Sequence, residues 1–203
     1  MAFCEPARGG KASGTRPEGN AGVTILPSAA RIGGSPDAPH APMRADSLRR
    51  RFRYHTWATT RLCEALADTP VEAAIRPLAH ALTADRVWLL RLRGEPTDAV
   101  ALWPRLDAAG GLALARRNAA DWLDVLAPDG EPLGDASLET PVRYADSRGD
   151  RHATPLGDVL DHVLLHAAYH RGQAAAALRA AGHAPPSTDF VLWLRLGEPA
   201  PDA

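Results

Sequence analysis

The segment DHVLLHAAYHRGQ, residues 161–173, carries a histidine at every fourth position, at His162, His166 and His170. Residues four apart in an α-helix lie one above the other on the same face. Two neutral imidazoles one turn apart can bind the same divalent metal ion, and this spacing recurs in helical metal sites. A metal held by histidines of a helix bundle usually keeps open coordination positions. The segment therefore predicts a helix with a candidate metal site along one side.

Hydrophobic spacing predicts that this helix is the last of four long ones. Thr154 suits its N-cap, Pro155 its first turn and Gly182 its C-terminal end. Three further long helices and one short helix are expected over residues 45–67, 77–93, 105–126 and 188–196. Four such helices joined by loops of uneven length predict an all-α fold, a four-helix bundle.

The helix starts and one hairpin are predicted from local signals. Asp46 or Ser47 can cap the first helix, and Pro77 suits the first turn of the second. Alternating residues over 138–144, followed by a turn over 146–150, predict a short hairpin before the last long helix.

A helical wheel drawn at about 100° per residue places the histidines relative to the core. His166 and His170 fall just inside the edge of the apolar face, and His162 and Gln173 fall slightly further out. Such a polar row bordering a core suits a metal site inside a bundle. On spacing alone, the alternative is a pair of partly buried histidines that make ordinary hydrogen bonds.

A third ligand must come from another segment, because two histidines rarely hold a metal alone. The other histidines in predicted long helices are His55 and His80. The helix around His80 is apolar nearly all round, so periodicity does not settle where this side chain points. On the same helix, Asp85 falls on the apolar side. If it is buried it needs a partner, such as Arg171 or a histidine; the alternative is that the helix is rotated and Asp85 meets water.

Composition and charge narrow the function classes. The chain has 203 residues, of which 45% are hydrophobic, and its formal net charge is -1. This balance predicts neither a nucleic-acid partner nor a membrane partner, and no apolar run is long enough for a transmembrane helix. The two cysteines, Cys4 and Cys63, fit a reducing cytosol, so we expect a cytoplasmic protein.

The chain is expected to divide into a tail and one domain. Residues 1–42 are rich in Gly, Pro, Ser and Ala and lack periodic apolar spacing, which predicts a disordered N-terminal tail. Residues 43–203 are expected to form the bundle domain. Met43 directly precedes the first helical pattern, so either translation starts there or the tail is dispensable.

Three segments together resemble the DinB/YfiT-like family of damage-inducible, metal-binding four-helix bundles. They are YHTWA at 54–58, LAHALTADRVWLLRLRG at 78–94 and HVLLHAAYHRGQ at 162–173, and the ending TDF at 188–190 agrees with them. The similarity covers about residues 44–196, with the His-Arg-Gly-Gln helix as its most specific part. This family is unrelated to the lesion-bypass polymerase that shares the name.

The resemblance implies that a divalent metal is held by His80, His166 and His170. Four further residues are expected to lie around these ligands and to orient their rings: Asp85, His162, Arg171 and Gln173. The resemblance also implies zinc or nickel as the metal, with iron or manganese as alternatives, and a homodimer. Two departures affect the expected substrate, because His55 and Leu165 stand where the family commonly has Asn.

Some relatives are S-transferases or isomerases that use a low-molecular-weight thiol such as bacillithiol or mycothiol. The leading hypothesis is therefore a metal-dependent enzyme, S-transferase-like or hydrolase-like, that activates water or a small thiol for attack on a small electrophile. The rival hypothesis is a non-enzymatic metal-binding stress-response protein that acts through a partner. Because metal-binding histidines must be neutral, metal affinity is expected to fall below about pH 6.

Overall fold

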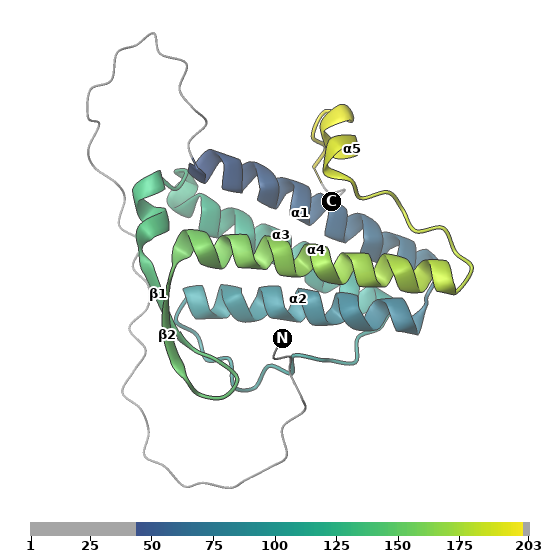
Figure 1. Ribbon diagram of the computed structural model, residues 1–203, viewed down its shortest axis with the longest axis horizontal. Helices are drawn as coiled ribbons and strands as arrows, with labels where there is room; N and C mark the ends of the chain where they lie inside the picture. The colour runs from purple at the N-terminus through teal and green to yellow at the C-terminus, as the bar shows by residue number, and fades with distance from the viewer. Residues whose placement is uncertain (1–43, 201–203) are drawn as a thin grey trace, which may run out of the picture.

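The computed structural model describes residues 44–200 and is dominated by four long helices (Figure 1). These are α1 (Arg44–Asp68), α2 (Glu72–Leu92), α3 (Ala108–Leu126) and α4 (Leu156–Ala180). The smaller elements are η1 (Pro128–Gly130), η2 (Asp135–Glu139), β1 (Pro141–Ala145), β2 (Arg151–Pro155) and α5 (Phe190–Arg195). The predicted bundle and hairpin are confirmed; the predicted tail, residues 1–42, lies outside the described residues.

The helices occupy the corners of the bundle in the order α1, α3, α2, α4. α1 makes few contacts with α2, although only residues 69–71 separate the two helices in the chain. Contacts of Phe52 with Trp122 and of Glu64 with Arg116 show that α1 and α3 are antiparallel. Consecutive helices α1 and α2 therefore lie diagonally across the core.

The α2–α3 connection runs the length of the bundle, because α2 and α3 point in the same direction. Leu82 meets Asn118 and Arg86 meets Asp121, which fixes this parallel arrangement. Residues 93–107 must therefore return along the bundle, and Figure 1 shows them passing beside α2. α2 and α4 are antiparallel and form the most extensive helix pair.

Two apolar clusters fill the bundle, and a polar layer separates them. The cluster toward the hairpin contains Phe52 and Trp122, whose ring centroids are 4.8 Å apart. The cluster toward the α1–α2 turn contains Cys63 and Leu178. The buried polar side chains of the intervening layer are His55, Thr59, His80, Thr83, Asp85, Asn118, His170 and Arg171. Since burying unpaired polar groups is costly, this layer is where a functional site is expected.

Two predicted features of the first helices are wrong. α1 begins at Arg44, so Asp46 and Ser47 lie inside its first turn and do not cap it. The carboxylate of Asp135 instead accepts hydrogen bonds from the backbone N–H groups of Arg44 and Ala45, at 3.2 and 2.8 Å. This cap comes from 90 or more residues away along the chain, and local sequence signals do not reveal it.

α2 also begins earlier than predicted, so Pro77 lies inside the helix and not in its first turn. The backbone N–H groups of Ala74 and Ile75 donate to the carbonyl of Val71, which starts the helix there. Ala74 is fully buried in the second apolar cluster. Packing of this extra turn offsets the single backbone hydrogen bond that a proline removes.

The start of α4 is also corrected, because Thr154 and Pro155 belong to strand β2. β1 and β2 pair antiparallel, and the pairing continues as far as Pro141 opposite Pro155. The helix then begins at Leu156, whose N–H donates to the Thr140 carbonyl at 2.9 Å. Strand pairing thus replaces the predicted Thr154 cap. None of the described helices is both long enough and apolar enough to cross a membrane.

Candidate metal centre

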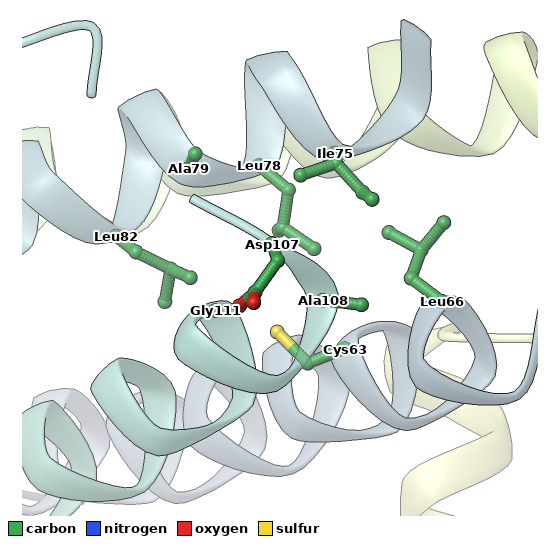
Figure 2. A pocket seen from close by; sticks show the side chains of 9 residues that line it. All are labelled: Cys63, Leu66, Ile75, Leu78, Ala79, Leu82, Asp107, Ala108 and Gly111. Carbon is green, nitrogen blue, oxygen red and sulfur yellow. The ribbon is translucent and has the colours of Figure 1, made fainter. Parts of the chain in front are cut away.

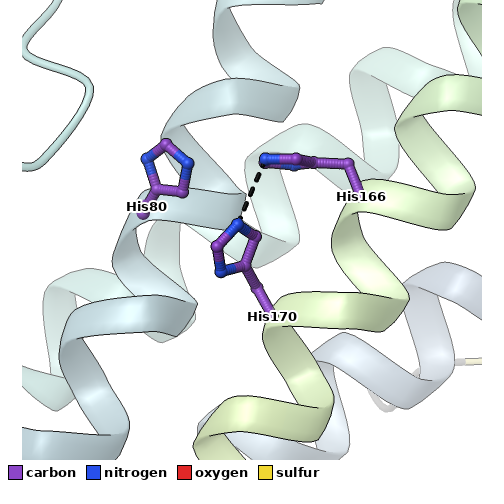
Figure 3. Close-up of side chains that lie close together, drawn as sticks. All are labelled: His80, His166 and His170. Atoms are coloured by element: carbon purple, nitrogen blue, oxygen red, sulfur yellow. Dashed lines mark hydrogen bonds between the residues drawn. The ribbon is translucent and has the colours of Figure 1, made fainter. Parts of the chain in front are cut away.

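Three histidines from two helices converge at the surface side of the polar layer (Figure 3). His80 comes from α2, and His166 and His170 come from successive turns of α4. Each offers a ring nitrogen, and these nitrogens lie within 4.8 Å of one another. The Nε2 atoms of His166 and His170 are 3.2 Å apart, a separation compatible with both nitrogens binding one ion at about 2.1 Å.

In His80 and His170, a hydrogen bond at one ring nitrogen determines that the other nitrogen is available to bind a metal. Nδ1 of His80 lies 2.7 Å from the Leu102 carbonyl oxygen, and Nδ1 of His170 lies 2.8 Å from Oε1 of Gln173. Both oxygens are acceptors, so each Nδ1 carries the hydrogen and each Nε2 keeps a lone pair. This is the arrangement that orients metal-binding histidines in known sites.

The electrostatic surroundings keep the three imidazoles neutral. Burial lowers the pKa of His80 and of His170. At His170 the hydrogen bond with Gln173 opposes this shift, and the proximity of His80 adds to it. The pKa of His166 is lowered to about 4, first by burial and then by the proximity of the other histidines. Neutral imidazoles are the form that binds metals. The three rings therefore stay in this form to a lower pH than the residue types alone suggest.

Trp103 of the α2–α3 connection lies flat against His80. The ring centroids are 3.9 Å apart and the rings are tilted by only 7°. Together with the Leu102 carbonyl, this stacking fixes both the tilt and the tautomer of His80. The sequence predicted neither contact, because both depend on the path of the connection beside α2. The one hint in the sequence was a large aromatic residue, Trp103, in a predicted loop. In the structure Trp103 is 47% exposed.

Asp85 and Arg171 lie deeper, in a separate hydrogen-bonded network with His55. Asp85 is only 2% exposed, which excludes the alternative that it faces water. Its Oδ2 accepts from Nε2 of His55 at 3.0 Å, and an Arg171 N–H donates to Nδ1 of the same ring at 3.0 Å. Since Arg171 can only donate, His55 carries its hydrogen on Nε2. A neutral imidazole therefore bridges a buried anion and a buried cation.

The four residues expected around the ligands thus have different positions. Gln173 hydrogen-bonds a ring of the triad directly. Asp85 and Arg171 bond to His55 beneath the triad. His162 is exposed, and its ring is stacked beside that of His166 with centroids 5.6 Å apart. Sequence reasoning considered a histidine as the partner of Asp85 but did not identify His55, which belongs to the diagonally opposite helix.

A small apolar cavity near Cys63 is not part of this site (Figure 2). It measures about 10 Å³ and lies among α1, α2 and the first turn of α3, with space for about one water molecule. Burial raises the pKa of the Cys63 thiol to about 12, so the thiol is protonated at neutral pH and is a poor nucleophile. Cys63 is a core residue.

Comparison with known proteins places the chain in a family. The sequence model of the DinB family matches residues 47–200. The chain belongs to the DinB family. The expectation from the three sequence segments is thereby confirmed, and the family match contains all three converging histidines. A DinB-family relative, Protein DinB of Bacillus subtilis (strain 168), is 25% identical over 160 residues, which cover 70% of this chain and 91% of the relative. No solved structure matches the chain.

Proposed function

We propose that this DinB-family protein binds one divalent metal ion through the Nε2 atoms of His80, His166 and His170. The observation that carries the proposal is the convergence of three ligand nitrogens from two helices. In two of the rings, moreover, the opposite nitrogen is already hydrogen-bonded to an oxygen. A pair of partly buried histidines joined by an ordinary hydrogen bond would account for the 3.2 Å contact of His166 with His170, but not for the third nitrogen, which comes from His80.

The donor set suits some metals better than others. Three neutral imidazoles without a carboxylate favour zinc or nickel over the harder manganese, with iron between them. A three-histidine set leaves positions for exogenous ligands, as in catalytic zinc sites. A bound ion would supply Lewis acidity, which lowers the pKa of a coordinated water or thiol.

The protein side chains favour a thiol over water as the activated group. Among the described residues, Asp85 is the buried carboxylate, and it accepts a hydrogen bond from His55. Within residues 44–200, no carboxylate joins the cluster of ligand nitrogens, so a water nucleophile would lack a carboxylate general base there. A small thiol that binds as thiolate loses its proton to solvent and needs no such base. We therefore propose thiol-dependent transfer to an electrophile as the activity.

Metal content is the first experiment. Elemental mass spectrometry on tag-free protein should find about one transition metal per chain, lost in His166→Ala and in His170→Ala but retained in His162→Ala. Loaded protein is then incubated with several thiols and a model electrophile. Failure to bind zinc, nickel, iron or manganese would refute the proposal. Metal binding without turnover with any thiol would favour a non-enzymatic metal-binding role.

A further inference from the structure

A second group of side chains continues the histidine row toward the hairpin. His162 precedes His166 by one turn of α4. Its ring makes a T-shaped contact with the Trp88 ring of α2, with ring centroids 5.6 Å apart. Beyond Trp88 lies the guanidinium of Arg91, whose central carbon is 4.7 Å from the Trp88 centroid and 4.9 Å from that of Tyr144. A row of aromatic and cationic groups thus leads away from the candidate metal centre.

Arg91 is a cation without a carboxylate partner among the described residues. One of its terminal N–H groups donates to the Ala145 carbonyl at 2.8 Å, and its buried Nε has no hydrogen-bond partner. By contrast, Arg86 and Arg93 on the same helix both pair with Asp121. Burial lowers the pKa of Arg91, and an anion bound beside it would offset this cost of desolvation.

The other groups at this position also leave room for an anion. His162 is exposed and makes no hydrogen bond to any described residue. The nearby carboxylates already have partners. Asp146 accepts from the His152 ring at 3.1 Å and from two backbone N–H groups, and Asp85 accepts from His55.

We propose that Arg91, His162 and Trp88 form a carboxylate-binding subsite, and that the small molecule bound at the metal carries a carboxylate. Arg91 would bind the carboxylate through Nη1, because Nη2 already donates to the Ala145 carbonyl and Nε is buried; the bond would be charge-assisted. The exposed His162 ring would add an N–H donor, and Trp88 would contact the carbon chain between the metal-binding atom and the carboxylate. This inference rests on the proposed metal site and specifies the ligand class for it.

The test compares two thiols that differ only in charge at the far end. Cobalt(II)-loaded protein is titrated with mercaptohexanoate and with mercaptohexanol, and binding is followed through the absorption of the cobalt–thiolate bond. The carboxylate should bind about tenfold more tightly, as expected for one charge-assisted interaction at a partly exposed site. Cobalt content is measured first by elemental mass spectrometry.

Matched variants assign the preference to its residues. Arg91→Gln should reduce the preference for mercaptohexanoate to less than about twofold, with the affinity for mercaptohexanol unchanged. His162→Gln should also reduce it, and it is the second variant because its exposed position does not threaten folding. Arg117→Gln, which removes an exposed arginine on α3, is the control and should keep the full preference.

The outcomes separate the two proposals. Absence of cobalt uptake would overturn the proposed metal function and this inference with it. Cobalt uptake with equal affinity for both thiols would overturn the carboxylate subsite alone. A preference that persists in both Arg91→Gln and His162→Gln would also overturn the subsite, because the selectivity would then come from other residues.

Discussion

The network of Asp85, His55 and Arg171 allows a quantitative test of how the polar layer is held together. Asp85 is 2% exposed and Arg171 is 5% exposed, so neither charge is stabilised by water. Oδ1 of Asp85 has no hydrogen-bond partner in the part of the chain that the structure describes, so the carboxylate depends on His55 and on the positive charge of Arg171 behind it. Removing one charge of a buried ion pair typically lowers the free energy of unfolding by about 3–5 kcal/mol.

We expect Arg171→Met to lower the free energy of unfolding by about 3–5 kcal/mol. The substitution removes the donor to Nδ1 of His55 and to Oγ1 of Thr59, and it leaves the Asp85 carboxylate buried without a counter-charge. Asp85→Asn keeps an acceptor for His55 but removes the charge. Added to Arg171→Met, Asp85→Asn should therefore restore at least about 2 kcal/mol, as coupled neighbouring residues do.

Urea unfolding at pH 7 in the presence of a chelator measures these free energies without a contribution from bound metal. Arg117→Met, at an exposed position on α3, is the control and should change stability by less than about 0.5 kcal/mol. If Asp85→Asn destabilises the Arg171→Met background as much as it destabilises the unsubstituted protein, the charges are not coupled and the reasoning fails.

Three other expectations concern ligand orientation, pH and helix stability. Gln173→Leu should weaken metal affinity about tenfold, because His170 loses the acceptor of its Nδ1 hydrogen; chelator competition measures this, and an unchanged affinity would show that the amide does not orient the ring. In the metal-free protein, the free energy of unfolding should fall between about pH 6.5 and 4, because unfolded histidines take up protons that His166, with a pKa of about 4, does not. His166→Gln should flatten this profile in urea titrations, and an equally steep profile in the variant would assign the effect elsewhere. Gly172→Ala should stabilise α4 by about 1 kcal/mol, since the added Cβ meets nothing within 4 Å. Gly182→Ala should do the opposite, because Gly182 has a φ of +83°; thermal melts that moved both variants the same way would contradict this.

Local patterns were sufficient for the features that depend on one helix at a time. The spacing of His166 and His170 follows from the helical repeat, and the wheel placed both at the edge of the core, where His170 is buried and His166 is partly exposed. The wheel also placed Asp85 on the apolar side of its helix, and it is buried. Helix starts were less predictable: Thr154 has the chemistry of a cap, yet pairing with β1 places it in a strand.

Sequence patterns were enough to predict the all-α bundle, the approximate positions of its long helices and the histidine row on α4, because these depend on the geometry of single helices and on short-range spacing. The family followed from the resemblance of three segments. Folding of the whole chain was needed for His80 to meet the row, for Trp103 to stack on His80 and for Asp85 to pair with His55. Those contacts join helices whose order around the core is not their order in the chain. A hydrophobic repeat specifies which face of a helix is buried, but several helix arrangements bury the same faces, and packing of the complete chain selects among them.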